Sequence, residues 1–181
     1  MDSGGLIARH SLAGDPRVRS MGLIGTEQPQ GLKFRFRLFL AGGSLPGFAS
    51  VLGWLAGQRR LRRNGFAFGD VFVDRDLLDG EFDEFFLQPL HTDEVMRSAA
   101  IEVLKSFDVA DVQALGDIHR RIEVPVRLVW GAQDKYFPIQ WAREMVSTFP
   151  NAELVTIADA GLLAHEERPE EVAKALLPIL T

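Results

Sequence analysis

The sequence predicts an α/β fold in which a parallel sheet carries an inserted layer of helices. The first observation is in the C-terminal third, where the short apolar runs Val126–Trp130 and Glu153–Ile157 alternate with helical segments. Strands that alternate with helices form a parallel sheet closed by right-handed crossovers. The second observation is a change of pattern between Pro29 and Gln113, where phenylalanine-rich helical pieces replace the alternation. This middle part is therefore expected to form a separate helical layer.

The N-terminal segment is expected to belong to the sheet region. The apolar spacing of Ser3–Leu12 predicts a helix, and the turn-forming residues 14–16 end it. Val18–Thr26 then predicts a strand.

In the middle of the chain, the apolar spacing of Asp93–Lys105 is typical of a helix. After the run Val126–Trp130, which has the length and composition of a buried parallel strand, Ile139–Phe149 predicts a helix. The last element is a helix over Glu167–Leu180, with Pro169 at its start, where proline is favoured.

The twenty residues Leu38–Gly57 contain no charged side chain and match the length of a membrane span. Five glycines, two serines and Pro46 interrupt them, and arginines flank both ends, which gives no preferred orientation. A membrane is therefore not expected as a partner. The expected structure is a pair of short buried helices broken near Gly42 and Pro46, with the arginines of the run 59–63 on a solvated face.

Composition excludes several kinds of chemistry. The chain has 181 residues, enough for one domain with a sizeable core, and a formal net charge of -5, which argues against nucleic acid as a partner. Without cysteine there is no disulfide, thiolate zinc site or cysteine nucleophile. The N-terminus lacks the basic stretch and apolar core of a secretory signal, so a cytoplasmic location is expected. The histidines show no metal-ligand spacing, and no cofactor is expected.

Two candidate site residues lie where predicted strands end, which is where ligands bind in open parallel sheets. Asp134 follows Val126–Trp130 after a glycine turn and could orient a histidine, or it could be a turn or helix-capping aspartate. His165 lies in the loop between the last strand and the last helix. It could be a general base or a loop residue held by hydrogen bonds.

Two motifs in Ile122–Leu180, "VPVRLVWGAQDKYFP" and "AGLLAHEERPEEVAKALLPIL", closely resemble the C-terminal end of cap-bearing enzymes of the α/β-hydrolase fold. In that family the aspartate after the "WGxxD" turn is the acid of the catalytic triad. The resemblance therefore assigns the acid to Asp134. The fold it implies is the C-terminal part of an α/β-hydrolase sheet with an inserted helical cap.

The N-terminus resembles the end of a nucleophile elbow. With Gly4 and Gly5 as the two closing small residues, the nucleophile position is Asp2, as in haloalkane dehalogenases and epoxide hydrolases. An aspartate in that place would attack an alkyl carbon and form an ester, which a histidine-activated water then cleaves. A strained strand-to-helix turn exposes such a nucleophile, and the helix N-terminus offers N–H groups to an oxyanion.

The chain departs from the family pattern at both ends. Leu162 stands where the family carries its catalytic base, and His165 matches a second, usually non-catalytic histidine. The candidate catalytic set is Asp2, Asp134 and His165, with a structural role as the alternative for His165. The family's first strands and oxyanion loop have no counterpart before Asp2, so the sheet is expected to need an upstream segment, a complementing chain or self-association.

The expected organisation is an elbow helix and strand over 1–28, a helical cap over 29–120 and a C-terminal core over 121–181. Most cap aromatics are expected in the core, and the rest would suit a small apolar substrate or ligand. The leading hypothesis is a hydrolase with an aspartate nucleophile, incomplete or impaired here. The alternative is a non-catalytic protein of the same fold that binds a ligand or a partner.

Overall fold

A computed structural model describes residues 2–180, without the side chain of Asp2. The chain forms two compact units. Unit 2 is Lys33–Phe107, and unit 1 comprises the segments before and after it. Residues 108–120, assigned above to the helical layer, pack within unit 1.

Unit 1 is built on a parallel three-stranded sheet in the order β1-β2-β3. In the register of the sheet, Met21 of β1 pairs with Val126 of β2, which in turn pairs with Ala152 of β3. The elements are α1 (Asp2–Leu12), β1 (Met21–Ile24), α7 (Val109–Gln113), α8 (Leu115–His119), β2 (Val126–Gly131), α9 (Ile139–Val146), β3 (Ala152–Ile157), α10 (Ala164–Glu167) and α11 (Pro169–Leu180). The predicted α/β class with parallel strands is confirmed.

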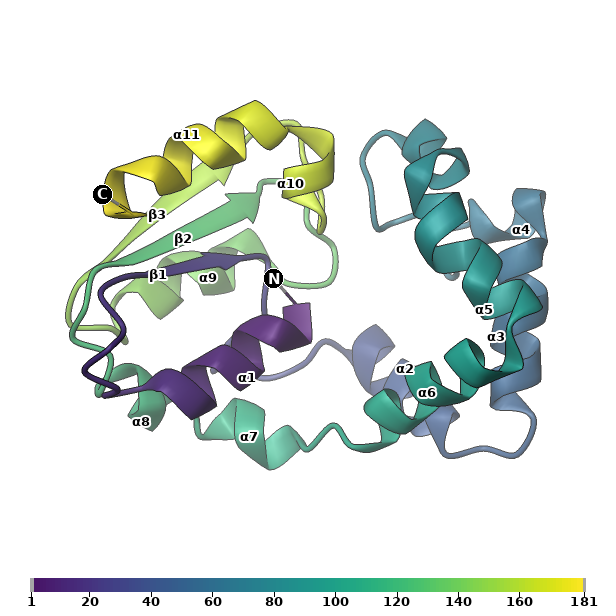
Figure 1. The fold of residues 1–181 in the computed structure, drawn as a ribbon, viewed down its shortest axis with the longest axis horizontal. Coiled ribbons are helices and arrows are strands. Elements are labelled where there is room, and N and C mark those ends of the chain that lie inside the picture. The colour runs from purple at the N-terminus through teal and green to yellow at the C-terminus, as the bar shows by residue number, and fades with distance from the viewer. Residues whose placement is uncertain (1, 181) are drawn as a thin grey trace. The chain divides into compact units, whose positions relative to one another are not determined.

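Helices cover both faces of this sheet. Figure 1 shows α11 on one side and α1 and α9 on the other. Side chains alternate along β2, so that Val129 packs with Val172 and Ala175 of α11. Leu128 and Trp130 are fully buried as well, and the indole Nε1 of Trp130 donates to the carbonyl oxygen of Phe137 at 2.8 Å.

A fully buried arginine joins α1 to the sheet. The guanidinium of Arg9 donates to the Oγ1 of Thr26 at 2.9 Å and to the backbone oxygen of Glu27 at 3.0 Å, just beyond β1. Its Nε donates to the backbone oxygen of Gly5 at 2.9 Å. The carboxylate of Glu27 is also fully buried and lies 3.9 Å from the guanidinium.

His119 extends this buried cluster to the residues that follow α9. Its Nε2 lies 3.1 Å from the Nη1 of Arg9, which can only donate, so Nε2 accepts and Nδ1 carries the proton. Nδ1 donates to the Oγ1 of Thr148 at 2.7 Å. The ring also stacks on Phe149, with centroids 3.8 Å apart. Arg9, Thr26, Glu27, His119 and Thr148 thus form one hydrogen-bonded network.

Burial in this network shifts the pKa values of His119 and Arg9. Burial is the main cause that lowers the pKa of His119 to about 3, and the nearby charge of Arg9 contributes to the same shift. Burial lowers the pKa of Arg9 to about 10, while the Glu27 carboxylate opposes that effect. At neutral pH the cluster therefore contains a neutral imidazole and a charged guanidinium.

Unit 2 is helical. Its elements are α2 (Phe34–Gly43), α3 (Phe48–Gly57), α4 (Arg59–Arg62), the 3-10 helix η1 (Arg75–Asp79), the π-helical turn η2 (Asp83–Leu87), α5 (Gln88–Thr92) and α6 (Glu94–Lys105). No single helix within residues 2–180 has the length and apolar character to cross a membrane. The pair α2 and α3 passes that test only together, with a bend of 116° between them.

The structure corrects two expectations for unit 2. Most of its aromatic side chains are not in the core: Phe72 is 4% exposed, whereas Trp54 is 54% and Phe66 is 91% exposed. The second correction concerns the arginine run, which is not wholly on a solvated face. Arg62 is buried, and its guanidinium binds Asp79 at 2.6 Å and Asp83 at 2.5 Å. A buried charge needs oppositely charged partners. Asp76, Asp79 and Asp83 provide them for the arginines of the run 59–63.

Stability should depend on pH through His119. The folded protein holds this imidazole neutral down to a pKa of about 3, whereas the unfolded chain protonates it near 6.5. The unfolded state therefore binds more protons between these values, and the stability that His119 contributes is lost as the pH falls from 6.5 towards 3. The predicted slope is at most about 1.4 kcal/mol per pH unit.

Urea unfolding followed by tryptophan fluorescence at several pH values measures this slope. His119→Gln can still accept from Arg9 but cannot titrate, so its stability should fall less steeply with acid. An identical slope in both proteins would contradict the assignment.

Candidate functional site

The candidate site lies in unit 1, where β1, β2 and β3 end at the same edge of the sheet. Parallel strands bring the loops after their carboxyl ends together. Gly25 follows β1, Asp134 follows β2, and Leu162 lies in the loop between β3 and α10. The sequence placed Asp134 and Leu162 at this edge, and the structure shows both there.

Asp134 is 7% exposed, and the turn that contains it holds its carboxylate in place. The Oδ1 accepts the backbone N–H of Tyr136 at 2.8 Å and that of Phe137 at 2.9 Å. These contacts are those of a turn aspartate, the second of the two roles that the sequence left open. They also pre-orient the carboxylate, as an acid that positions another group requires.

Leu162 and Asp134 both lie close to Gly25. A Cβ on Gly25 would lie 2.9 Å from the carbonyl oxygen and 3.8 Å from the Cδ1 of Leu162, and 3.6 Å from the Oδ2 of Asp134. The two side chains therefore flank the same point. The backbone of Gly25 has φ +34°, and only glycine leaves room for this approach.

A buried carboxylate also shapes the loop that carries Leu162. Glu167 is 7% exposed, and its Oε2 accepts the backbone N–H of Gly161 at 2.5 Å. Leu162 follows directly and is 9% exposed. An apolar, buried side chain thus occupies the position that faces the Asp134 region.

His165 lies three residues further on, in α10. Its Nε2 is 3.6 Å from the Oε1 of Glu166, and its Nδ1 is buried without a hydrogen-bond partner among residues 2–180. Neither nitrogen therefore bonds to Asp134. Burial lowers the pKa of His165, and the carboxylate of Glu166 opposes that effect. The imidazole is neutral at neutral pH, the form that a base needs.

Asp2 is the first residue of α1, but its side chain lies outside the described part of the structure. The next residue is described: the Oγ of Ser3 donates to the Oε1 of Glu27 at 3.1 Å. α1 also packs tightly on the end of β1, because a Cβ on Gly5 would lie 2.4 Å from the Oγ1 of Thr26. The start of α1 is thus held at the same edge of the sheet as Gly25.

Sequence reasoning did not identify the cluster that supports this arrangement. It considered His119 only as a candidate metal ligand and did not single out Arg9 or Glu27. No spacing could reveal the cluster, since Arg9 and His119 are 110 positions apart. No local signal marked these residues, because Glu27 stands in the polar run 26–30 and Arg9 is followed by His10.

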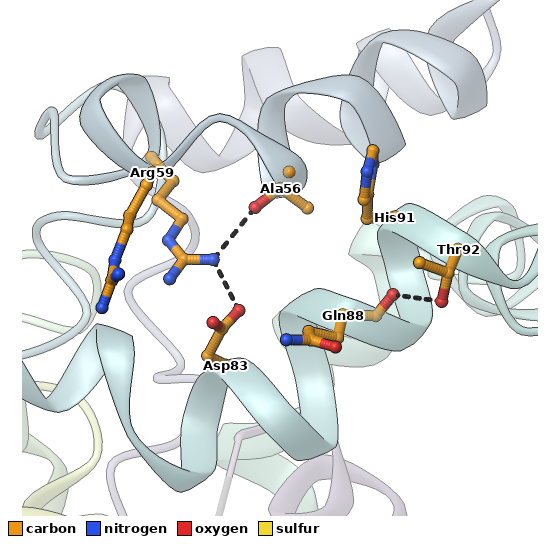
Figure 2. A pocket seen from close by; sticks show the side chains of 8 residues that line it. Ala56, Arg59, Asp83, Gln88, His91 and Thr92 are labelled. Carbon is orange, nitrogen blue, oxygen red and sulfur yellow. Dashed lines mark hydrogen bonds and ion pairs between the residues drawn. The ribbon is translucent and has the colours of Figure 1, made fainter.

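Unit 2 contains a polar pocket of about 320 Å³, shown in Figure 2. Arg62 and Asp83 form an ion pair at its wall. His91 donates from Nδ1 to the backbone oxygen of Gly53 at 3.0 Å, which leaves its Nε2 as an acceptor. Opposite charges cancel locally, so the pocket offers no single charged recognition group. Within residues 2–180, no group of three or more His, Asp or Glu side chains could hold a metal ion.

Comparisons with known proteins agree with the geometry. A family model described as "Alpha/beta hydrolase family" matches residues 2–175. The uncharacterized hydrolase YugF of Bacillus subtilis (strain 168) is 22% identical over 105 residues, which cover 58% of this chain and 37% of that protein.

Two solved structures are similar over 98% of this chain, each with a TM-score of 0.72 and 18% identity. One is MGS-M2, an alpha/beta hydrolase enzyme from a Medee basin deep-sea metagenome library, of which 62% is covered. The other is 2-hydroxy-6-oxo-6-phenylhexa-2,4-dienoate hydrolase from Rhodococcus sp. strain RHA1, of which 60% is covered. The chain thus spans less than two thirds of the length of these proteins, and the likeness to the solved structures shows the fold.

Asp134 should matter for stability through its turn. Asp134→Ala leaves the N–H groups of Tyr136 and Phe137 without their acceptor, and we expect it to lower the free energy of unfolding by about 2 kcal/mol. Asp134→Asn keeps an oxygen acceptor and should cost less. Urea titration of both variants makes the comparison, and equal losses would show that the charge, not the turn, stabilises this loop.

Proposed function

Because the chain belongs to the α/β hydrolase family, we propose that unit 1 carries a hydrolase site in which Asp2 is the nucleophile and Asp134 the acid. One observation carries the proposal. The buried carboxylate of Asp134 is held at the edge where the strands end, and the start of α1 is tied to the same edge. The family resemblance puts the nucleophile at that helix start.

The proposed first step is a substitution. The carboxylate of Asp2 attacks an alkyl carbon, an oxygen–carbon bond forms, and the bond from carbon to its leaving group breaks. The leaving group departs with the electron pair, as a halide ion or as the alkoxide of an opened epoxide. Backbone N–H groups at the start of α1 favour negative charge there. This step requires no histidine.

The second step requires a base. Hydrolysis of the Asp2 ester needs water that has given up a proton, and an imidazole beside Asp134 would take it. Here the buried side chain of Leu162 flanks that carboxylate, and a leucine cannot accept a proton. We therefore expect ester formation to outpace ester cleavage, so that the covalent intermediate accumulates.

The amino-acid composition of unit 2 supports a small apolar substrate. The segment Lys33–Phe107 is rich in phenylalanine, and many of its aromatic side chains are exposed rather than packed in its core. Small haloalkanes and alkyl epoxides match both this apolar character and the electrophilic carbon that an aspartate nucleophile attacks.

The covalent step predicts an adduct at Asp2. Incubation of the chain with bromohexane should raise its mass by one hexyl group, and epoxyhexane by one hydroxyhexyl group. Peptide mass spectrometry should place either group on Asp2. Asp2→Asn should form no adduct. The matched control is Asp15→Asn, which changes an acid in the loop after α1. An adduct that persists in Asp2→Asn would contradict the nucleophile assignment.

Restoring the base should restore turnover. Leu162→His places an imidazole beside the Asp134 carboxylate, and general-base catalysis contributes about a hundredfold or more to such a step. Steady-state product release should therefore rise by at least about tenfold. Leu162→Gln is the matched control, since it is polar but cannot serve as the base. His165→Gln in the parent chain shows whether His165 supplies the residual turnover.

A non-catalytic ligand-binding role is the second candidate, and the buried Leu162 favours it. A protein of this kind would bind a small apolar ligand saturably without forming an adduct. Leu162→His would then gain no turnover. Isothermal titration with a non-reactive alkane, read beside the adduct assay, separates the two functions.

A further inference from the structure

One face of α2 exposes large apolar side chains next to a free cation. Phe34, Arg37 and Leu38 have the i, i+3, i+4 spacing that places residues on the same side of a helix. Phe34 is 77% and Leu38 is 61% exposed, and Arg37 is exposed as well. On the opposite side of the helix, Gly43 is buried and Phe36 packs edge-on against Phe107.

The residues after α2 also include exposed apolar side chains. Leu45, in the turn before α3, is 64% exposed, and Val51 and Trp54 of α3 are 59% and 54% exposed. Monomeric proteins seldom leave so many large apolar side chains in one short segment open to water. A contact surface is the usual reason for such an arrangement.

Charge indicates what this surface contacts. Residues 28–69 contain seven lysines and arginines and no aspartate or glutamate. Four of the arginines bind aspartates beyond that segment: Arg35, Arg59, Arg62 and Arg63. Lys33, Arg37 and Arg60 are exposed and form no ion pair with a carboxylate among residues 2–180. The apolar face of α2 is therefore bordered by uncompensated positive charge.

We propose that the exposed face of α2, with Leu45 in the following turn, binds the surface of an anionic phospholipid bilayer. Lys33 and Arg37 would meet lipid phosphates, while Phe34 and Leu38 enter the boundary between headgroups and acyl chains. Basic side chains at the border of an exposed apolar surface attract anionic lipid headgroups near the membrane surface. This partner is independent of the chemistry in unit 1.

The helices lie on the bilayer and do not cross it. Each of α2 and α3 has ten residues and is about 15 Å long, half of the hydrocarbon core. The bend of 116° prevents the two from forming one continuous rod. The sequence argument against a membrane span therefore stands, whereas the proposed surface contact replaces the expectation that a membrane is not a partner.

Vesicle sedimentation tests the proposal. The full chain should pellet with vesicles of phosphatidylcholine and phosphatidylglycerol in equal parts, and much less with phosphatidylcholine alone. Lys33→Glu with Arg37→Glu should lower the bound fraction at subsaturating lipid by at least about tenfold, and added salt should weaken binding by the parent chain. Phe34→Ser with Leu38→Ser should lower it as well.

The matched control is Val95→Ser with Val103→Ser on α6. These valines are 77% and 66% exposed, close to the fractions of Phe34 and Leu38, but Glu94 and Glu102 stand next to them. The control should bind vesicles as the parent chain does, and circular dichroism should show all variants folded.

Four results would overturn the proposal. The first two are no binding to the mixed vesicles and equal binding to both kinds of vesicle. The third is a loss of vesicle binding in the α6 control equal to the loss in the α2 variants. The fourth is that the parent chain is an oligomer in the absence of lipid and that replacing Phe34 and Leu38 dissociates it. The last result would assign the face to a second copy of this chain.

Discussion

The buried guanidinium of Arg9 is the constraint on which unit 1 depends. A charge without solvent costs several kcal/mol unless partners replace its hydration. Arg9 obtains them from the backbone of its own helix, from Thr26 and Glu27 after β1, and from His119. Each partner can satisfy the guanidinium only from one position. The helix that follows Asp2 is therefore fixed against the end of β1, and α8 is fixed against both.

This placement decides what the edge of the sheet can do. The loops after β1, β2 and β3 meet where Gly25 allows Leu162 and Asp134 to approach the same point. The carboxylate is held as a triad acid would be, yet its neighbour is a buried leucine. In the proposed reaction, the groups needed for ester formation by the Asp2 carboxylate are present. The group that would accept a proton from water during ester hydrolysis is missing.

The sequence predicted the sheet and the edge residues because these depend on local pattern. The apolar run Val126–Trp130 marks β2 within one residue, and the glycine turn after it places Asp134. The Arg9–His119 contact could not be predicted, because two residues 110 positions apart meet only in the folded chain. The exposure of Trp54 was missed for a different reason. Apolar spacing shows that a helix has an apolar side, but it does not show whether other residues cover that side.

The most direct test of the central claim is the stoichiometry of bromide release from bromohexane in a rapid-mixing experiment. A site with a nucleophile and no base should release a burst of one bromide ion per chain, followed by a much slower phase limited by hydrolysis of the ester. Linear release without a burst would show that hydrolysis is not the impaired step. No release would show that Asp2 does not attack, and the account of unit 1 as a hydrolase site would fail.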